Sequence, residues 1–252
     1  MALQYDRYHD ELLAETARLA LLVRSTSPSH PVPTCPDWIF TDLTAHVGQG
    51  HRWAATIVER RATEWVRQDE ADDRDVPDGT DARAEWLLAG ARRLSAAVRD
   101  AGPLATVWTW ADEQTAGFWL RRLTHETVIH RVDAELAVGH PPLLDAALAA
   151  DGVSDLLACI STLSGDTVEP MFAALRGEGQ TLHFHATDTA GEWFVRRTPT
   201  GVEWEHGHRR ADVAVRGRAI DLLLVLNRRA TGGVSVIGDE QLFAHWLDNS
   251  AF

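Results

Sequence analysis

The segment "RRLTHETVIHRVDAE", residues 121–135, carries two ionisable side chains, Glu126 and His130, in a pattern that otherwise predicts a helix packed into a core. Positions i and i+4 lie about 40° apart around a helix, so both side chains can point at one place. A carboxylate inside a core needs a partner, because burying an unpaired charge is costly. The segment therefore predicts a packed helix with a polar site on its inner side.

The inward positions of this helix should recur every three or four residues. They are Ala116, Trp119, Leu120, Leu123, Thr127, His130, Ala134 and Ala137. Glu126 follows Leu123 by three residues and lies at the edge of this stripe.

A second helical pattern carries a similar polar residue among apolar ones. Its stripe is Leu43, Val47, Gly50, Trp53, Ala54 and Ile57. His46 lies on this stripe, three residues after Leu43. His51 follows His46 by five residues, about 140° around the helix, so we expect it to point elsewhere.

Two histidines and one glutamate that converge inside a bundle would match the ligand set of a catalytic zinc site, which keeps one position open for water or substrate. A second interpretation needs no metal. Glu126 then pairs with Arg122 on the helix surface, and His130 is a hydrogen-bonded core histidine. Spacing alone leaves both interpretations open, because His46 comes from a distant segment.

The composition predicts an ordinary soluble protein. The 252 residues suffice for one large or two small domains, and 45% of them are hydrophobic and 24% charged. A net charge of −13 argues against binding to nucleic acid or to anionic membranes, because both would repel the chain. We expect no signal peptide and no membrane span, and two isolated cysteines favour a reduced cytoplasm.

The first half of the chain is expected to be helical. Apolar periodicity predicts helices at residues 9–24, 41–65, 81–102, 113–138 and 143–163. Thr41 is the expected N-cap of the second helix. Four helices with a long connection between the second and the third predict a four-helix bundle, and the fifth helix is expected to lead out of it.

Short segments with alternating apolar residues follow residue 178. Strands are expected at residues 181–188, 192–198, 201–207, 211–217 and 234–239, and helices at 219–230 and 240–249. The expected fold class is α+β in two domains. Residues 1–150 should form the helical bundle, and residues 151–252 a small α+β domain with a mostly antiparallel sheet.

The remaining histidines and cysteines are weaker candidates for a site. His183 and His185 alternate on one strand face and could bind a metal, but a solvated face is the expected role. His206 and His208 flank a glycine in a predicted turn and are interpreted in the same way. Cys35 lies in a proline-rich loop, and the sequence shows no base within reach of its thiol.

Three segments, in this order along the chain, resemble the mycothiol-dependent maleylpyruvate isomerase family. "VPTCPDWIFTDLTAHVGQGHRWA" (32–54) resembles its opening signature, and "RRLTHETVIHRVDAELA" (121–137) resembles its second signature. "GDEQLFAHWLDN" (238–249) is similar to its C-terminal domain. The resemblance implies a DinB-like, metal-binding four-helix bundle followed by an α+β domain with a sterol-carrier-like fold.

The resemblance also implies a site. The metal ligands of the family fall on His46, Glu126 and His130, with zinc as the metal, although another divalent metal is possible. An arginine of the C-terminal domain faces the site in the family. Arg228 is our choice for this residue and Arg229 the next, although Arg228 could simply follow a helix C-terminus, where cations are favoured.

The implied chemistry is thiol activation, with mycothiol as the low-molecular-weight thiol. A thiol bound to zinc loses its proton at neutral pH. In an isomerase the thiolate adds to a conjugated double bond, the carbon–carbon bond rotates, and the thiol leaves. In a transferase the adduct is kept. An arginine would hold the carboxylate of the substrate.

Two other functions remain open at this point. One is a metallohydrolase that activates water, and the other is a non-enzymatic ligand-binding or regulatory protein that keeps the fold. The expected partners are a small thiol and a small electrophilic substrate, without nucleic acid or membrane. The chain is expected to be a monomer or a homodimer.

Overall fold

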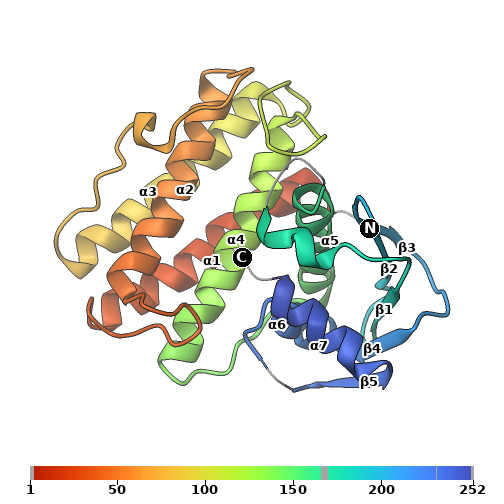
Figure 1. Cartoon of the computed structure of the whole chain (residues 1–252). Helices are drawn as coiled ribbons and strands as arrows, with labels where there is room; N and C mark the ends of the chain where they lie inside the picture. The colour runs from red at the N-terminus through yellow and green to blue at the C-terminus, as the bar shows by residue number, and fades with distance from the viewer. Residues whose placement is uncertain (1–2, 166–169, 231, 251–252) are drawn as a thin grey trace. The chain divides into compact units, whose positions relative to one another are not determined.

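The computed structural model describes residues 3–165, 170–230 and 232–250 (Figure 1). The chain divides into two compact units, of which one is Leu3–Pro142 and the other begins at Leu143. Each unit has its own core and is described by itself.

The first unit is a bundle of four helices (Figure 1). They are α1 (Tyr5–Ser25), α2 (Phe40–Glu59), α3 (Thr80–Ala101) and α4 (Ala116–Ala137). Helices α1 and α2 each pack against both α3 and α4. A short 3₁₀ turn, Gln68–Glu70, lies in the long connection between α2 and α3. The expected four-helix bundle is confirmed.

The helix ends show where local sequence signals succeed and fail. Gly102 and Gly139 end α3 and α4 with positive φ angles of 83° and 75°, which favour glycine. The predicted N-cap of α2 is wrong. The N–H of Ile39 donates to the Asp42 carboxylate at 3.0 Å, so Ile39 is the capping residue. The Thr41 hydroxyl instead donates to the carbonyl of Pro28 in the preceding loop.

The predicted apolar stripes agree with burial, with one informative exception. Every expected inward position of α4 is buried except Ala137, which is partly buried. In α2, Gly50 and Trp53 are partly buried and the four other stripe positions are buried. His46 departs from the expectation, because 43% of its side chain is exposed. It lies at the margin of the stripe, where its ring can reach both solvent and α4.

Helix α4 is buried on more than one side, which its mixed sequence does not suggest. Arg131 and Asp133 are completely buried there. The Arg131 guanidinium donates to Glu15 of α1 at 2.6 Å, so a buried charge pair ties these two helices together. The helix that supplies two of the candidate ligands is therefore held firmly in the bundle.

The second unit is α+β. Its helices are α5 (Ala146–Leu163), α6 (Ala219–Leu226) and α7 (Glu240–Asn249), with a 3₁₀ segment at Pro170–Leu175. Its strands are β1 (Thr181–Ala186), β2 (Glu192–Thr198), β3 (Gly201–His206), β4 (Val213–Gly217) and β5 (Val234–Gly238). These elements coincide closely with the predicted segments.

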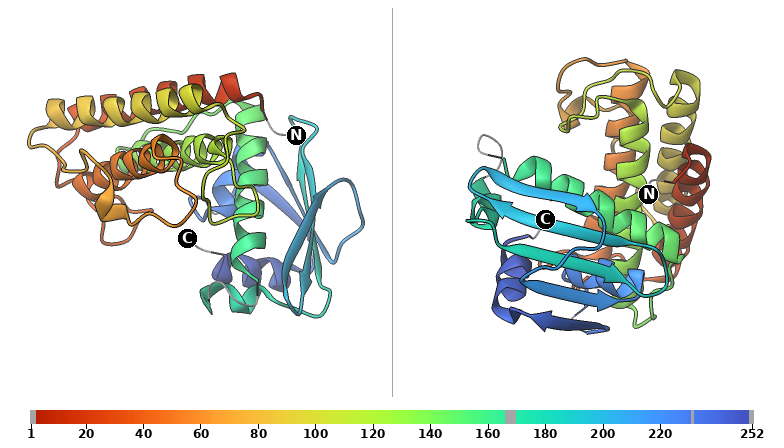
Figure 2. Two further views of the ribbon diagram at one scale, coloured as in Figure 1. Left: turned by 90° about the horizontal axis from the view of Figure 1, so that it is seen from above. Right: turned by 90° about the vertical axis from the view of Figure 1, so that its right-hand side faces the viewer.

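The five strands form one sheet in the order β3-β2-β1-β4-β5 (Figure 2). Only the β1–β4 pair is parallel, so the expected mostly antiparallel sheet is confirmed. Helices pack on one face. The ring of Phe184 on β1 contacts Phe243 and Trp246 of α7, and Trp193 on β2 donates to Ser154 of α5. Side chains alternate along a strand, so the neighbours of Phe184 in β1 point to the opposite face.

Helix α5 belongs with the second unit, because it packs against α6 and β3. The expected domain boundary after residue 150 falls inside this helix, whereas the compact units divide after Pro142. The boundary after residue 150 stays a prediction that limited proteolysis can examine.

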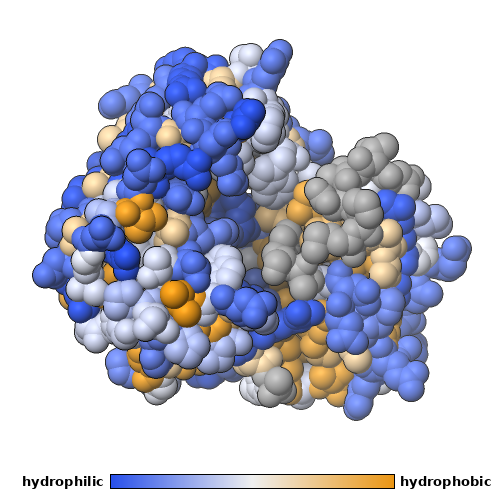
Figure 3. All heavy atoms as spheres, turned by 60° about the vertical axis from the view of Figure 1, so that its left-hand side comes forward, coloured by the Kyte–Doolittle hydropathy of each residue, from blue (hydrophilic) through white to orange (hydrophobic). Residues whose placement is uncertain are grey.

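Helix α5 also has the length and apolar composition to cross a membrane, alone among the helices of the described residues. This is weak support for a span, because 61% of that segment is buried inside the protein. The segment also contains two acidic residues, Asp151 and Asp155. On the face drawn in Figure 3, hydrophilic residues predominate, with smaller hydrophobic patches between them.

Candidate metal centre in the helical bundle

Three side chains from two helices meet in the bundle: His46 of α2, and Glu126 and His130 of α4. One oxygen of Glu126, Oε1, lies 3.0 Å from Nε2 of His46 and 3.2 Å from Nε2 of His130. The three ligand atoms lie within 4.8 Å of one another. The one-turn spacing of Glu126 and His130 and the packing of α2 on α4 produce this arrangement. The structure thus brings the three residues together, and their binding of a metal stays a prediction.

The second oxygen of Glu126 has a different partner. Oε2 accepts a hydrogen bond from Nη2 of Arg122 at 2.5 Å. The ion pair of the metal-free interpretation is therefore present, but it uses the other oxygen and coexists with the cluster. Arg122 fixes the orientation of the carboxylate, so that Oε1 faces the two imidazoles.

Glu126 is ionised at neutral pH. Burial by itself would raise the pKa of Glu126, but the Arg122 guanidinium and hydrogen bonds with His130 and His46 outweigh burial and hold that pKa well below its usual range. The cluster therefore contains a fixed negative charge between two nitrogen donors, which is what a divalent cation requires.

A buried carboxylate, Asp133, orients His130. Its Oδ2 lies 2.9 Å from Nδ1 of His130, and its Oδ1 accepts the Thr34 hydroxyl at 2.6 Å. The Cys35 thiol also donates to Oδ2, at 3.2 Å. Because Asp133 accepts a hydrogen bond from the Nδ1–H group of His130, Nε2 is the nitrogen directed at Glu126. Carboxylates that hold a ligand histidine in this way are a regular part of metal sites.

Sequence reasoning did not find Asp133, although a signal existed. Asp133 follows His130 by three residues, which places both on neighbouring positions of α4. The sequence also showed no base near Cys35, whereas the folded loop brings its thiol to the Asp133 carboxylate. Neither Thr34 nor Cys35 could be placed from spacing, because they come from the loop before α2.

His130 binds a proton tightly when no metal competes. Burial lowers the pKa of His130, but hydrogen bonds to Asp133, Cys35 and Glu126 outweigh burial and raise the pKa well above its usual value. A metal ion that binds here has to displace this proton. The cost is offset by the two carboxylates, which stabilise positive charge on either side of the ring.

Trp38 covers one side of the cluster. Its ring stacks on the His130 ring at 5.6 Å between centroids and 27° between planes, and it lies 5.0 Å from the His46 ring. Trp38 comes from the same loop as Thr34 and Cys35. This loop therefore supplies both the hydrogen bonds behind His130 and an aromatic wall beside the two imidazoles.

His51 points away from the cluster, as predicted. It is completely buried, and its Nε2 lies 2.8 Å from the Thr127 hydroxyl. That hydroxyl donates its proton to the carbonyl of Leu123 at 2.6 Å, so His51 must donate from Nε2. Burial lowers the pKa of His51 to about 3, and the ring stays neutral. His51 is a core histidine.

Two parts of the chain match models of known protein families. Residues 9–135 match the mycothiol maleylpyruvate isomerase N-terminal domain, and residues 147–245 match the MDMPI C-terminal domain, which has the same family abbreviation. The chain belongs to the mycothiol maleylpyruvate isomerase family. The resemblance of the three sequence segments is thereby confirmed.

Two solved structures share the fold of this family member. They are crystal structures of a mycothiol-dependent maleylpyruvate isomerase, with a TM-score of 0.63, and of a histidine-to-alanine mutant of it, with a TM-score of 0.62. Each is 16% identical to this chain, and each comparison covers 93% of both chains. At this identity the likeness shows the two-domain α+β fold alone. No curated protein matches the sequence significantly.

The family resemblance also pointed to an arginine of the second domain. Arg228 directly follows the C-cap of α6 and has a positive φ of 60°. Its side chain is exposed, and its Nη1 lies 3.4 Å from the carbonyl of Leu247 in α7. Arg229 donates to the carbonyl of Asn227 at 2.8 Å. Both arginines belong to the second compact unit, and a role at the bundle cluster stays a prediction.

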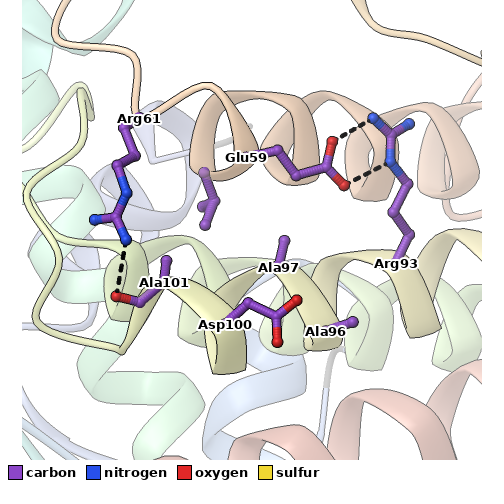
Figure 4. A pocket seen from close by; sticks show the side chains of 8 residues that line it. Glu59, Arg61, Arg93, Ala96, Ala97, Asp100 and Ala101 are labelled. Atoms are coloured by element: carbon purple, nitrogen blue, oxygen red, sulfur yellow. Dashed lines mark hydrogen bonds and ion pairs between the residues drawn. The ribbon is translucent and has the colours of Figure 1, made fainter.

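A surface pocket of the bundle involves none of these residues. It lies between the end of α2 and the end of α3 (Figure 4). The Glu59–Arg93 ion pair spans it, with one contact of 2.6 Å, and Arg61 reaches the carbonyl of Ala101. Glu59 and Arg93 thus pair with each other and Arg61 with the backbone, and Asp100 also lines the pocket.

Proposed function

We propose that this member of the mycothiol maleylpyruvate isomerase family is an enzyme that acts on a small electrophilic substrate with mycothiol as its thiol. His46, Glu126 and His130 would hold the required metal, for which zinc is the first choice. The name of the family and of the solved relatives supports an isomerase, with maleylpyruvate as the first substrate to test. An S-transferase that keeps the thiol adduct fits the same residues.

The observation that carries this proposal is the shared oxygen of Glu126. Two imidazole nitrogens from different helices lie 3.0 and 3.2 Å from this one atom. Zinc takes imidazole nitrogen and carboxylate oxygen at about 2.0–2.2 Å, and three protein ligands leave one position for a further ligand. Three ligand atoms within 4.8 Å of one another fit this donor set.

The metal and the protein have separate tasks in this proposal. A zinc ion, when bound, lowers the pKa of a coordinated thiol so that the thiolate exists at neutral pH. Asp133 orients His130 and balances its charge, and Arg122 directs the carboxylate of Glu126. Trp38 limits the access of water to the two imidazoles. Arg228 is our proposed partner for a carboxylate of the substrate.

The first test uses two matched histidine substitutions in the full chain. His46→Ala should lose the metal of this site and all mycothiol-dependent conversion of maleylpyruvate. His46 is 43% exposed, so its removal should leave the fold intact. His140→Ala removes another exposed histidine of the same unit and should keep both properties. Full conversion by the His46→Ala protein would contradict the proposal.

A second test separates thiol chemistry from the hydrolytic alternative. Cobalt(II) is substituted for zinc, and absorption spectra are recorded with and without mycothiol. Coordination of the thiol should add a sulfur-to-metal charge-transfer band that is absent in the His46→Ala protein. A spectrum that mycothiol does not change, in a protein that hydrolyses substrate, would favour a metallohydrolase. A regulatory protein would show no turnover with any electrophile.

A further inference from the structure

A second group of histidines gathers on the sheet of the other compact unit. His183 and His185 lie on β1, Glu192 begins β2, and His208 lies in the loop between β3 and β4. One ligand atom from each of the four lies within 4.8 Å of all the others. All four residues belong to one compact unit, so the cluster does not depend on how the two units are arranged.

The pairing of the strands builds this cluster. His183 and His185 are two residues apart and therefore point to the same face of β1, opposite to Phe184, which faces α7. Glu192 pairs directly with His185 across β1 and β2. Cross-strand partners have neighbouring side chains, so three of the four residues are fixed by sheet register alone. His208 joins them from the adjacent loop.

Glu192 is the centre of the cluster. Its Oε1 lies 2.7 Å from Nδ1 of His185, and its Oε2 lies 3.0 Å from Nδ1 of His208. The same Oε2 lies 3.7 Å from Nε2 of His183, which is too far for a hydrogen bond. The His183 and His208 rings are in edge-to-face contact at 4.9 Å between centroids.

His183 corrects the prediction of a solvated face. Only 4% of its surface is exposed, and its Nε2 is a buried polar atom without a hydrogen-bond partner. Buried polar atoms in native proteins are nearly always paired, so an unpaired one calls for an explanation such as a missing ion. This nitrogen lies near the carboxylate of Glu192, and the His183 ring contacts the ring of His208, so two other members of the cluster are beside it.

We infer that His183, His185, Glu192 and His208 form a second binding site for a divalent transition metal, with zinc as the best-suited ion. Imidazole nitrogen and carboxylate oxygen are zinc ligands at about 2.0–2.2 Å, and a tetrahedral site then spaces neighbouring ligand atoms by about 3.4 Å. The contacts of Glu192 with the three histidines span 2.7 to 3.7 Å, on either side of this value. The missing partner of His183 Nε2 would be the ion.

The number of ligands indicates a structural role. Four protein ligands fill a tetrahedral zinc site and leave no position for substrate, in contrast to sites with three protein ligands. The ion would join β1, β2 and the β3–β4 loop, to which the exposed His208 belongs. Metal binding should therefore stabilise this unit against unfolding.

The test measures zinc binding in the full chain with the bundle site disabled. His46→Ala is combined with His208→Ala in one protein and with His206→Ala in a second. His206 and His208 are both exposed, so both proteins should fold, and only His208 contributes to the cluster. Metal-free proteins are titrated with zinc by calorimetry, and their melting temperatures are recorded with and without zinc.

We expect the His46→Ala/His206→Ala protein to bind one equivalent of zinc and to melt at a higher temperature when loaded. The His46→Ala/His208→Ala protein should lose this equivalent and the zinc-induced shift. Equal zinc binding by the two proteins would overturn the inference. Because both proteins lack His46, the measurement does not depend on the bundle site. A negative result would therefore leave the proposed function untouched, and loss of the proposed function would not affect zinc binding to the sheet cluster.

Cobalt(II) gives an independent readout of the same proteins. In the His46→Ala/His206→Ala protein, it should produce the intense visible bands of tetrahedral coordination, without a sulfur-to-metal band when mycothiol is added. The His46→Ala/His208→Ala protein should show neither the tetrahedral bands nor a sulfur-to-metal band. A sulfur-to-metal band in the first protein would mean an open position and would contradict the four-ligand site.

Discussion

The two histidine–glutamate clusters differ in the way the backbone assembles them. In the bundle, Glu126 and His130 are one helical turn apart, and His46 arrives from a second helix. In the sheet, His183 and His185 are two residues apart on one strand, and Glu192 is a cross-strand partner. Each cluster centres on one glutamate that contacts every histidine. The bundle has three candidate ligands, which would leave one coordination position of a zinc ion free. The sheet has four, which would fill all positions of a tetrahedral site.

The clusters also differ in electrostatics. His130 has Asp133 behind it and Glu126 in front, and these hydrogen bonds outweigh burial and raise its pKa well above the usual value. Burial lowers the pKa of His183, and the neighbouring imidazoles lower it further, against the opposing charge of Glu192. Hydrogen bonds with two carboxylates and Cys35 thus outweigh burial and raise the pKa at His130, whereas the single carboxylate of Glu192 does not outweigh burial and the two imidazoles at His183. The bundle site must release a proton to bind metal, whereas His183 is already in its ligand form.

The largest expected effect comes from the same substitution at both centres. Glu126→Gln should weaken zinc binding in the bundle by more than about 100-fold and remove thiol-dependent turnover, because it deletes a ligand and not only an outer partner. Glu192→Gln should weaken zinc binding in the sheet and leave turnover intact. Zinc calorimetry and a maleylpyruvate assay measure both effects. If Glu192→Gln abolished turnover and Glu126→Gln did not, the assignment of roles would be reversed.

Removal of the carboxylate behind His130 should have a smaller effect. Asp133→Asn keeps the size of the side chain but removes its charge, and it should weaken zinc binding in the bundle by about 10–100-fold. Thr34→Ala is the control, because it removes a hydrogen bond to Asp133 and leaves the charge in place. Melting temperatures of both proteins show whether the fold is kept. Unchanged zinc affinity in a folded Asp133→Asn protein would argue against an orienting role.

The response to pH should also distinguish the clusters. Zinc has to displace the proton of His130, so affinity in the bundle should fall about tenfold per pH unit as the pH drops below the raised pKa of His130. Calorimetry in buffers with different ionisation enthalpies counts the protons released. The Glu192→Gln protein isolates the bundle site for this measurement. Zinc binding there without proton release at neutral pH would show that His130 is not protonated in the metal-free protein.

His51 provides the smallest expected effect on metal binding. His51→Asn should leave zinc affinity in the bundle nearly unchanged, because the ring points into the core.

His51 should instead affect how stability depends on pH. Burial lowers the pKa of His51 to about 3 in the folded protein, so as the pH falls the ring is protonated in the unfolded chain first. Stability is therefore lost as the pH falls below about 6.5. The loss from this residue between pH 7 and 5 should be about 2 kcal/mol. Urea unfolding at both pH values should show a change in stability that is about 2 kcal/mol less favourable in the wild type than in His51→Asn.

Much of the fold could be predicted because its signals are local. Strand β2 and helix α7 fall on their predicted residues, since alternation and helical periodicity are properties of short segments. Helix ends were harder. Thr41 has the chemistry of an N-cap, but its hydroxyl donates to the Pro28 carbonyl. The N-cap is Ile39, whose N–H donates to the Asp42 carboxylate.

The candidate site was predictable only where spacing within one element defines it. Glu126 and His130 follow from one helix, and the distant His46 was selected because it interrupts an apolar stripe. Thr34 and Trp38 come from a loop that no periodicity describes, whereas Asp133 lies three residues after His130 on α4 and could have been found from that spacing. The sheet cluster was dismissed because alternation alone cannot show that His183 is buried, or that His208 folds back onto β1 and β2.

The most direct test of the account is X-ray absorption at the zinc edge in the full-length His208→Ala protein, which lacks a ligand of the sheet cluster. The account predicts a zinc ion with nitrogen and oxygen neighbours only, which gains one sulfur neighbour at about 2.3 Å when mycothiol is added. A zinc environment that mycothiol leaves unchanged, or one that survives the further change His46→Ala, would contradict a thiol-binding metal held by His46, Glu126 and His130.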